Sequence, residues 1–147
     1  LGGVLMQETD LRSENKGDFE VVTKKQPTED ELDDFVFAQK VAKHCKSNAV
    51  ALVKDSHLLA VGIGQTSRVA ALKQAIEKAQ HFGFDLRGAV LASDAFFPFD
   101  DCVTLAAEAG VTAVVQPGGS MRDGDSIAKA DELGLAMVFT GVRHFKH

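Results

Sequence analysis

The second half of the chain alternates short, unbroken apolar runs with segments of helical character. Ala89–Ala92, Ala113–Val115 and Leu135–Phe139 contain no polar residue, so neither side of these strands is suited to face water. The helical segments between them end at Gly110 and Gly134, and glycine after a helix is typical of a left-handed stop. Apolar strands separated by helices indicate parallel pairing in a sheet that is covered on both faces. The pattern therefore predicts an α/β fold in three layers.

The first half adds a helix, a hairpin and a second helix. Thr28 followed by Glu31 forms a capping-box pattern, and apolar residues then recur on one face of a helix near residues 29–46. A hairpin would make the sheet mixed rather than purely parallel. The hairpin strands and the helix after them are expected at residues 49–53, 57–63 and about 67–82.

Length and composition exclude several classes of protein. A chain of 147 residues fits one domain and can bury about 70% of its extended surface without a disulfide or metal. Its net charge of −5 disfavours a coat for nucleic acid or anionic lipid, and no apolar run approaches the roughly 18 residues of a membrane helix. Cys45 and Cys102 form no CxxC pair, which favours a reducing, cytoplasmic setting.

The first 27 residues are expected to differ from the rest of the chain. The apolar run Val4–Met6 is followed by a polar run from Gln7 to Asp18 and then by Phe19–Thr23. The first and last of these segments could form two short strands, or an arm that continues from a preceding domain. Because the chain starts at Leu1 and not at methionine, we interpret it as part of a longer polypeptide, with residues 28–147 as its folded unit.

Three segments follow the predicted parallel strands, where ligands of open α/β sheets bind. The first holds Phe96, Phe97 and Phe99 between acidic residues. One interpretation is that these rings fill the core while Asp100 caps the next helix, which is the commoner fate of aromatic loops. The other is a flat slot for a planar heterocycle, with Asp101 as hydrogen-bond acceptor for ring nitrogens.

The other two segments also allow two interpretations each. Pro117–Ser120 could bring backbone amides to an anion or a polar ring, or could be only a turn. Arg143 with Phe145 could grip an anionic planar ligand, although basic chain ends are usually solvated. Asn48 could satisfy backbone groups at a helix end, which is its commoner role. The five histidines show no metal-ligand spacing with the cysteines, so we expect no zinc site.

Taken together, five blocks resemble a known family. They are Lys46–Asn48, Gly62–Arg68, Ser93–Phe99, Gln116–Asp123 and Thr140–Phe145. In this order and spacing they resemble the carboxyl-terminal part of the bifunctional purine-biosynthesis family, which joins AICAR transformylase to IMP cyclohydrolase. The resemblance covers nearly the whole chain and is specific, because five separate blocks agree.

The resemblance implies a function and a fold. The family transfers a formyl group from 10-formyltetrahydrofolate to the amine of AICAR (aminoimidazole carboxamide ribonucleotide), and a separate amino-terminal domain then closes the ring to IMP. It also implies a homodimer with shared active sites. The implied fold is a unit similar to cytidine deaminase, without that fold's zinc.

The resemblance further implies roles for single residues. AICAR would be surrounded by Asn48, Arg68, Phe96, Arg143 and Phe145, with Asn48 orienting the substrate. Folate would be lined by Pro98, Phe99, Asp101 and Ser120, and Asp94 falls where a potassium ion is implied. The family's proton-transferring Lys–His pair would lie upstream of residue 1, so the chain alone is predicted to be inactive or nearly so. The alternative is a non-catalytic module for dimerisation and nucleotide binding.

Overall fold

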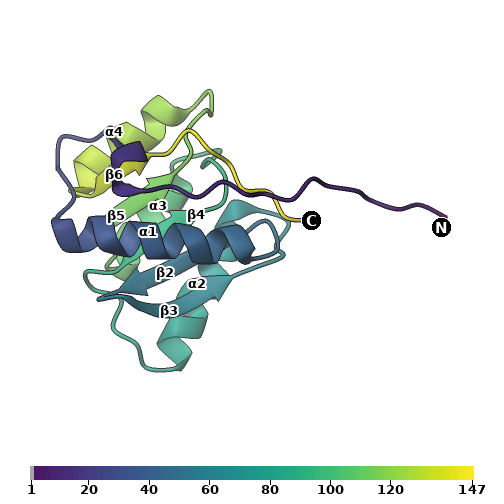
Figure 1. Cartoon of the computed structure of the whole chain (residues 1–147). Coiled ribbons are helices and arrows are strands. Elements are labelled where there is room, and N and C mark those ends of the chain that lie inside the picture. The colour runs from purple at the N-terminus through teal and green to yellow at the C-terminus, as the bar shows by residue number, and fades with distance from the viewer. Residues whose placement is uncertain (1) are drawn as a thin grey trace.

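The computed structural model describes residues 2–147, which form a three-layer α/β fold (Figure 1). The first elements in chain order are η1 (Lys16–Asp18), β1 (Glu20–Val21), α1 (Glu29–His44), β2 (Val50–Lys54), β3 (His57–Gly62) and α2 (Arg68–His81). They are followed by β4 (Val90–Ser93), α3 (Asp101–Ala109), β5 (Ala113–Gln116), α4 (Asp123–Leu133) and β6 (Ala136–Phe139). None of the helices in this described part is long and apolar enough to cross a membrane.

The six strands form one mixed sheet in the order β1-β6-β5-β4-β2-β3. β4, β5 and β6 run parallel, as their separation by helices predicts. β2 is antiparallel to both β3 and β4, and β1 is antiparallel to β6. The predicted mixed α/β sheet is confirmed.

Helices cover both faces of this sheet (Figure 1). On one face, Phe35, Ala38 and Ala42 of α1 pack against the sheet in one apolar cluster. On the other face, a second cluster joins α2, α3 and α4 to the sheet through residues such as Leu72 and Val103. Burial on both sides explains why the central strands carry no polar alternation.

Local signals set the ends of several elements. The Thr28 hydroxyl accepts a hydrogen bond from the Glu31 amide at 3.1 Å, and the Glu31 carboxylate accepts one from the Thr28 amide at 2.9 Å. This is the predicted capping box. Gly110 and Gly134 end α3 and α4 with φ of 104° and 73°, a region that glycine enters without steric cost. Asp100 occupies the N-cap position of α3, as one interpretation had it, but its side chain makes no capping hydrogen bond.

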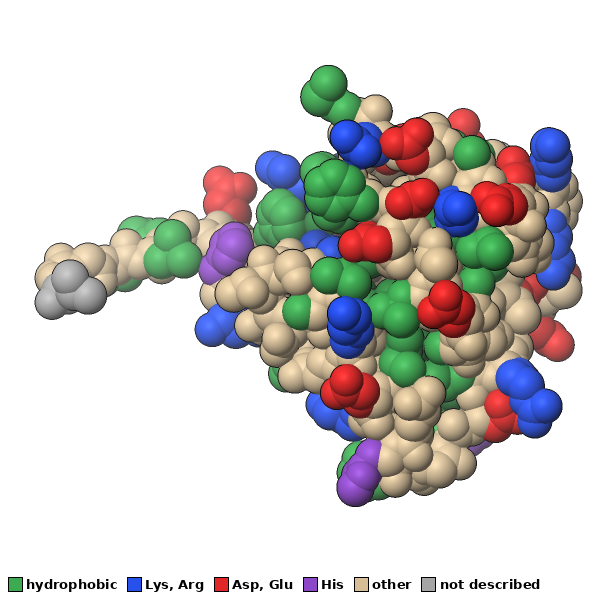
Figure 2. Space-filling model, turned by 180° about the vertical axis from the view of Figure 1, so that it is seen from behind, with side chains coloured by type: hydrophobic (Ala, Val, Ile, Leu, Met, Phe, Trp, Pro, Cys, Tyr) green, Lys and Arg blue, Asp and Glu red, His purple; other side chains and the backbone are tan. Residues whose placement is uncertain are grey.

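The first residues differ from the two-strand alternative. Val4–Met6 form no strand, and Phe19–Thr23 contains only the two residues of β1. Residues 2–15, named the arm from here on, run across the domain and then project beyond it (Figure 1). The side chains of Val4, Leu5 and Met6 are more than three-quarters exposed, and the projecting arm carries apolar side chains in Figure 2. Leu1 lies outside the described residues.

The strand pairing brings distant loops to one edge of the sheet. Val50, the first residue of β2, pairs with Gly62 at the end of β3 and with Ser93 at the end of β4. Glu20, at the start of β1, pairs with Phe139 at the end of β6. The segments that precede β1 and β2 and those that follow β3, β4, β5 and β6 therefore share this edge, named the carboxyl edge below.

Candidate active site at the carboxyl edge

A pocket of about 310 Å³ opens at the carboxyl edge. It is lined by Asn48, Thr66, Ser67, Arg68, Ala95, Phe96, Pro98 and Phe145. These residues come from the loops before β2 and after β3 and β4, and from the carboxyl-terminal segment. Four of the five residues predicted to surround AICAR line it, together with one of the predicted folate residues, Pro98.

Arg68, the first residue of α2, is the charged group of this pocket and is only 5% exposed. Its Nη1 donates to the Ala49 carbonyl at 3.0 Å and forms an ion pair with the carboxylate of Asp94. Its Nη2 donates to Oδ1 of Asn48 at 2.9 Å. The buried Nε–H has no partner among the described residues. Buried donors in proteins are usually satisfied, so this N–H lacks the acceptor that such a group normally has.

Asn48 is held in place by the groups on both sides of it. Its Nδ2 donates to the Gln65 carbonyl at 3.0 Å, while its Oδ1 accepts from Arg68. The Ser47–Asn48 peptide bond is cis. A carboxamide offers two N–H groups and two lone pairs, so one donor and one acceptor of Asn48 remain for a ligand.

Asp94 is fully buried behind the pocket, directly after β4. One carboxylate oxygen pairs with Arg68, and the other accepts from the Ser47 hydroxyl at 2.7 Å. Ser47 in turn bonds the backbone of Lys146 twice, each time at 2.8 Å. Carboxylate, hydroxyl and carbonyl oxygens are the donors that hard cations prefer, so the residues around Asp94 fit the implied potassium ion.

The aromatic loop after β4 separates into buried and exposed rings. Phe97 is fully buried in the core, and its backbone amide donates to Oε1 of the buried Gln116 at 3.0 Å. Phe96 is 36% exposed and lines the pocket, whereas Phe99 is 51% exposed. The core-filling interpretation is therefore right for Phe97 and wrong for Phe96 and Phe99. The buried Gln116 thus anchors the backbone of the one ring in this loop that is fully buried.

The predicted folate residues other than Pro98 lie outside this pocket. Phe99 packs under the guanidinium of Arg122, whose Cζ is 5.2 Å from the ring centroid. The Asp101 carboxylate accepts from the Cys102 amide at 2.8 Å, and the Ser120 hydroxyl accepts from the Arg122 amide at 3.1 Å. These residues belong to the loops after β4 and β5, which the sheet brings to the same edge.

Two amides of the turn at Pro117–Ser120 are already bonded within the chain. The amides of Gly119 and Ser120 donate to the carboxylate of Asp123 at 2.7 and 3.1 Å. The interpretation of this turn as an anion cradle is therefore wrong for these two residues. Gly118 is required for another reason, because a Cβ there would lie 2.6 Å from the Phe139 ring.

The carboxyl-terminal segment brings Arg143 and Phe145 together. The Arg143 Cζ lies 5.0 Å from the centroid of the Phe145 ring, and Phe145 lines the pocket while Arg143 is exposed beside it. The two side chains are therefore in contact. Their proposed hold on a ligand stays a prediction.

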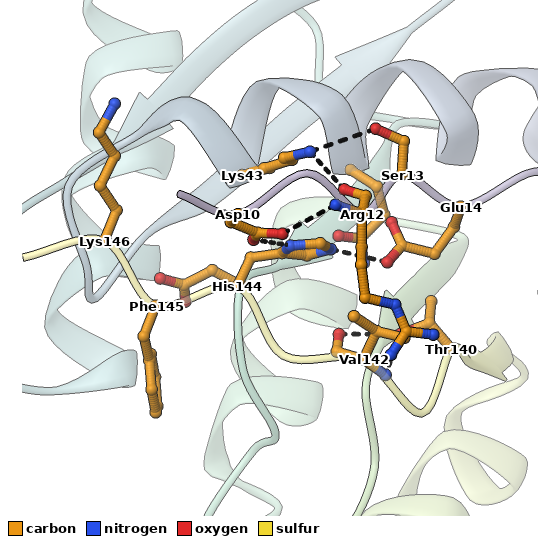
Figure 3. A network of polar contacts seen from close by, with 12 residues as sticks. Asp10, Arg12, Ser13, Glu14, Lys43, Thr140, Val142, His144, Phe145 and Lys146 are labelled. Carbon is orange, nitrogen blue, oxygen red and sulfur yellow. Dashed lines mark hydrogen bonds and ion pairs between the residues drawn. The ribbon is translucent and has the colours of Figure 1, made fainter. Parts of the chain in front are cut away.

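His144, between those two residues, was not singled out from the sequence. It is 1% exposed and lies between two carboxylates of the arm, those of Asp10 and Glu14 (Figure 3). Burial lowers the pKa of the imidazole, but the hydrogen bonds to Glu14 and Asp10 outweigh it, and the net pKa lies above its usual value. No local pattern in the sequence marked His144, because both of its carboxylate partners lie more than 100 residues away.

The two cysteines are poor candidates for nucleophiles. Burial, with Asp101 beside it, raises the pKa of Cys102 to about 12, and burial also raises the pKa of Cys45. We expect this chain to react with a disulfide reagent at pH 8 far more slowly than free cysteine does, because the thiolate is the reactive form. Denaturation should then release both thiols. Rapid modification of either thiol in the folded chain would contradict this expectation.

A family model described as "AICARFT/IMPCHase bienzyme" matches residues 1–78. The chain belongs to the AICARFT/IMPCHase bienzyme family. Relatives named "Bifunctional purine biosynthesis protein PurH" are 59% identical in Bacteroides thetaiotaomicron and 60% identical in Leuconostoc citreum, over all of this chain. Another from Aquifex aeolicus is 54% identical over 99% of it. The chain spans 28–29% of the length of these relatives.

Among solved structures, this family member is similar to deaminases. A diaminohydroxyphosphoribosylaminopyrimidine deaminase/5-amino-6-(5-phosphoribosylamino)uracil reductase from Thermotoga maritima shares 26% identity, with a TM-score of 0.51, over 76% of this chain and 35% of that chain. A dCMP deaminase from cyanophage S-TIM5 shares 20% identity, with a TM-score of 0.55, over 76% and 98%. The expected deaminase-like α/β fold is thereby confirmed. Within residues 2–147 no three His, Cys, Asp or Glu residues gather as metal ligands would.

Proposed function

We propose that this chain forms one wall of a formyltransferase site, at which 10-formyltetrahydrofolate donates its formyl group to the amine of AICAR in IMP biosynthesis. The observation that carries the proposal is the pocket in which Asn48, Arg68, Phe96 and Phe145 meet. Membership of a family described by this activity supports it, as do the purine-biosynthesis names of the relatives.

The residue types suit a flat, polar substrate. Asn48 retains one donor and one acceptor, and Arg68 retains a buried N–H, so the two can hold a carboxamide in one orientation. The exposed parts of Phe96 and Phe145 offer apolar surface to the imidazole ring. Arg143, stacked on Phe145, is placed for a phosphate or carbonyl oxygen. AICAR's amine is a poor nucleophile, and fixing it at attack distance from the formyl carbon can supply several orders of magnitude in rate.

The folate would lie along the neighbouring loops. Pro98 is shared with the pocket, and Phe99 next to it is half-exposed, as a surface for a planar ring must be. Asp101 and Ser120 follow on the same edge and carry oxygen acceptors for ring nitrogens. A potassium ion, when bound, would add positive charge behind the pocket, and Asp94 and Ser47 are the residues that would hold it.

Proton transfer requires groups from outside this chain. The pocket lining contains no His, Lys, Asp or Glu among the described residues, so nothing in it can accept a proton from the amine near neutral pH. We propose that the base comes from the remainder of a longer, cytoplasmic homodimer. The same lining suits the second candidate, a non-catalytic nucleotide-binding module, and activity measurements separate the two.

A chimaera tests the proposed function. In it, this chain replaces the matching segment of the Bacteroides thetaiotaomicron protein, with which it is 59% identical. Phe96→Ala should lower kcat/KM for formyl transfer to AICAR by about 10- to 100-fold, through lost ring contact, and leave IMP cyclohydrolase activity intact. Phe82→Ala, at an exposed ring beyond α2, is the matched control and should change neither activity.

Two other outcomes of the Phe96→Ala measurement would contradict the proposed function. A selective loss of cyclohydrolase activity would assign the pocket to that reaction instead. Unchanged formyl transfer, with AICAR still binding to the chimaera, would favour the non-catalytic module.

A further inference from the structure

The contacts of His144 join the two ends of the described chain. Its Nε2 lies 2.6 Å from Oε1 of Glu14, and its Nδ1 contacts the carboxylate of Asp10. The two partners lie 130 and 134 residues away in the sequence. The name arm clamp is used below for these three residues. Figure 3 shows the imidazole between the two carboxylates, with Phe145 pointing away from them.

The arm is held by further contacts, between the two clamp carboxylates and ahead of them in the sequence. Lys43 of α1 donates to the Arg12 carbonyl and lies 3.3 Å from the Ser13 hydroxyl (Figure 3). Gln7 donates to the Phe145 carbonyl and accepts from the His147 amide at 3.1 Å. The arm therefore lies between α1 and the carboxyl-terminal segment, and it contacts the backbone of a residue that lines the pocket.

The carboxyl-terminal segment depends on such contacts, because no helix or strand follows β6 in the described chain. Its backbone is tied at the amides of Thr140 and Gly141, at His144, whose amide donates to the Asp94 carbonyl at 2.7 Å, and at Lys146. Arg143 and Phe145 sit on either side of His144. Contacts that hold His144 therefore also restrict the backbone on which Arg143 and Phe145 are carried.

We infer that Asp10 and Glu14, acting through His144, are positioning residues that hold Arg143 and Phe145 at the AICAR pocket. The inference rests on the proposed function for the identity of the ligand. The clamp itself rests only on contacts among the described residues. The buried imidazole lies between two carboxylates, so replacing either one by a neutral amide weakens a charge-assisted hydrogen bond and loosens both segments.

The test uses the chimaera with Asp10→Asn, Glu14→Gln and the double substitution, and Glu8→Gln as the control. Glu8 lies on the same arm, is exposed, and makes no hydrogen bond or ion pair with any other residue of the described range 2–147. The double variant should raise KM for AICAR by about 10-fold and change kcat by less than about 3-fold, as expected when binding geometry alone is lost. Asp10→Glu keeps the charge, so its KM for AICAR should be closer to that of the unsubstituted chimaera than the KM of Asp10→Asn is. In a chimaera that already carries His144→Asn, Asp10→Asn and Glu14→Gln should cause no further rise in KM for AICAR.

Hydrogen exchange provides a readout that does not depend on AICAR. The amides of His144 and Lys146 should exchange at least about 10-fold faster in the double variant than in the Glu8→Gln control. Unchanged exchange would overturn the clamp. Faster exchange with an unchanged KM would overturn the positioning role, provided Phe96→Ala still impairs formyl transfer. If Phe96→Ala has no effect either, the proposed function fails and the positioning role falls with it, whereas the exchange result still decides the clamp.

Discussion

Replacing Arg68 by methionine should lower the free energy of unfolding of this chain by about 3–5 kcal/mol. The substitution removes the guanidinium from a pair in which both side chains are buried, and it leaves the Asp94 carboxylate fully buried with only the Ser47 hydroxyl as a side-chain partner. A buried charge without its counter-charge costs far more than an exposed one. Denaturant unfolding of the two proteins measures the difference. In the chimaera, the same change should also abolish AICAR binding.

Two controls separate the buried charge from the mere loss of an arginine. Arg87→Met breaks another Arg–Asp pair, with Asp85, but at a fully exposed site, and no measurable change in stability is expected. Arg68→Met combined with Asp94→Leu removes both charges and should be more stable than Arg68→Met alone. Equal destabilisation by Arg68→Met and Arg87→Met would show that the buried pair is not special.

Replacing Phe97 by alanine should cost about 3–5 kcal/mol of unfolding free energy, the usual range for a buried phenylalanine. The ring is fully buried in the cluster between the sheet and α2–α4. Its removal leaves a cavity beneath the loop that carries Phe96 into the pocket. We therefore expect weakened AICAR binding in the chimaera as a secondary effect. Thermal and denaturant unfolding of the isolated chain measure the primary one.

Phe99→Ala is the matched control within the same loop. It removes an identical ring that is half-exposed and packs on Arg122. Its effect on stability should stay below about 1 kcal/mol, as is usual for surface positions. If the two substitutions destabilise the chain equally, the separation of the loop into a buried and an exposed ring is wrong.

Both predictions and the arm clamp concern the same small region. Asp94 bonds Arg68 through its side chain and the His144 amide through its carbonyl, so the pocket wall and the carboxyl-terminal segment share one buried residue. A change at Arg68 is therefore expected to speed the exchange of the His144 amide as well. Substitutions more than about 10 Å apart without shared partners usually have additive effects. Arg68 and His144 share Asp94, so we expect the effects of substitutions at these two residues not to be additive.

The sequence by itself determined the elements and their order. The capping box at Thr28, the glycine stops at Gly110 and Gly134, and the apolar strands are local signals, and a local signal acts wherever the rest of the chain lies. Alternation of helices with apolar strands then sufficed for a three-layer α/β fold, because few arrangements cover such strands on both faces. The same pattern predicted which loops lie at the carboxyl edge, because these loops follow the predicted parallel strands.

Only the tertiary structure decided which side chains meet there. The sequence marked Phe96, Phe97 and Phe99 equally, and only the packing of the folded chain shows that Phe97 alone is fully buried. Nothing in the local pattern pairs Arg68 with Asp94, 26 residues away, or His144 with the arm, more than 100 residues away. A charged group that is buried loses its contacts with water, so it is stable only beside an opposite charge. Which opposite charge is close enough depends on how the whole chain folds.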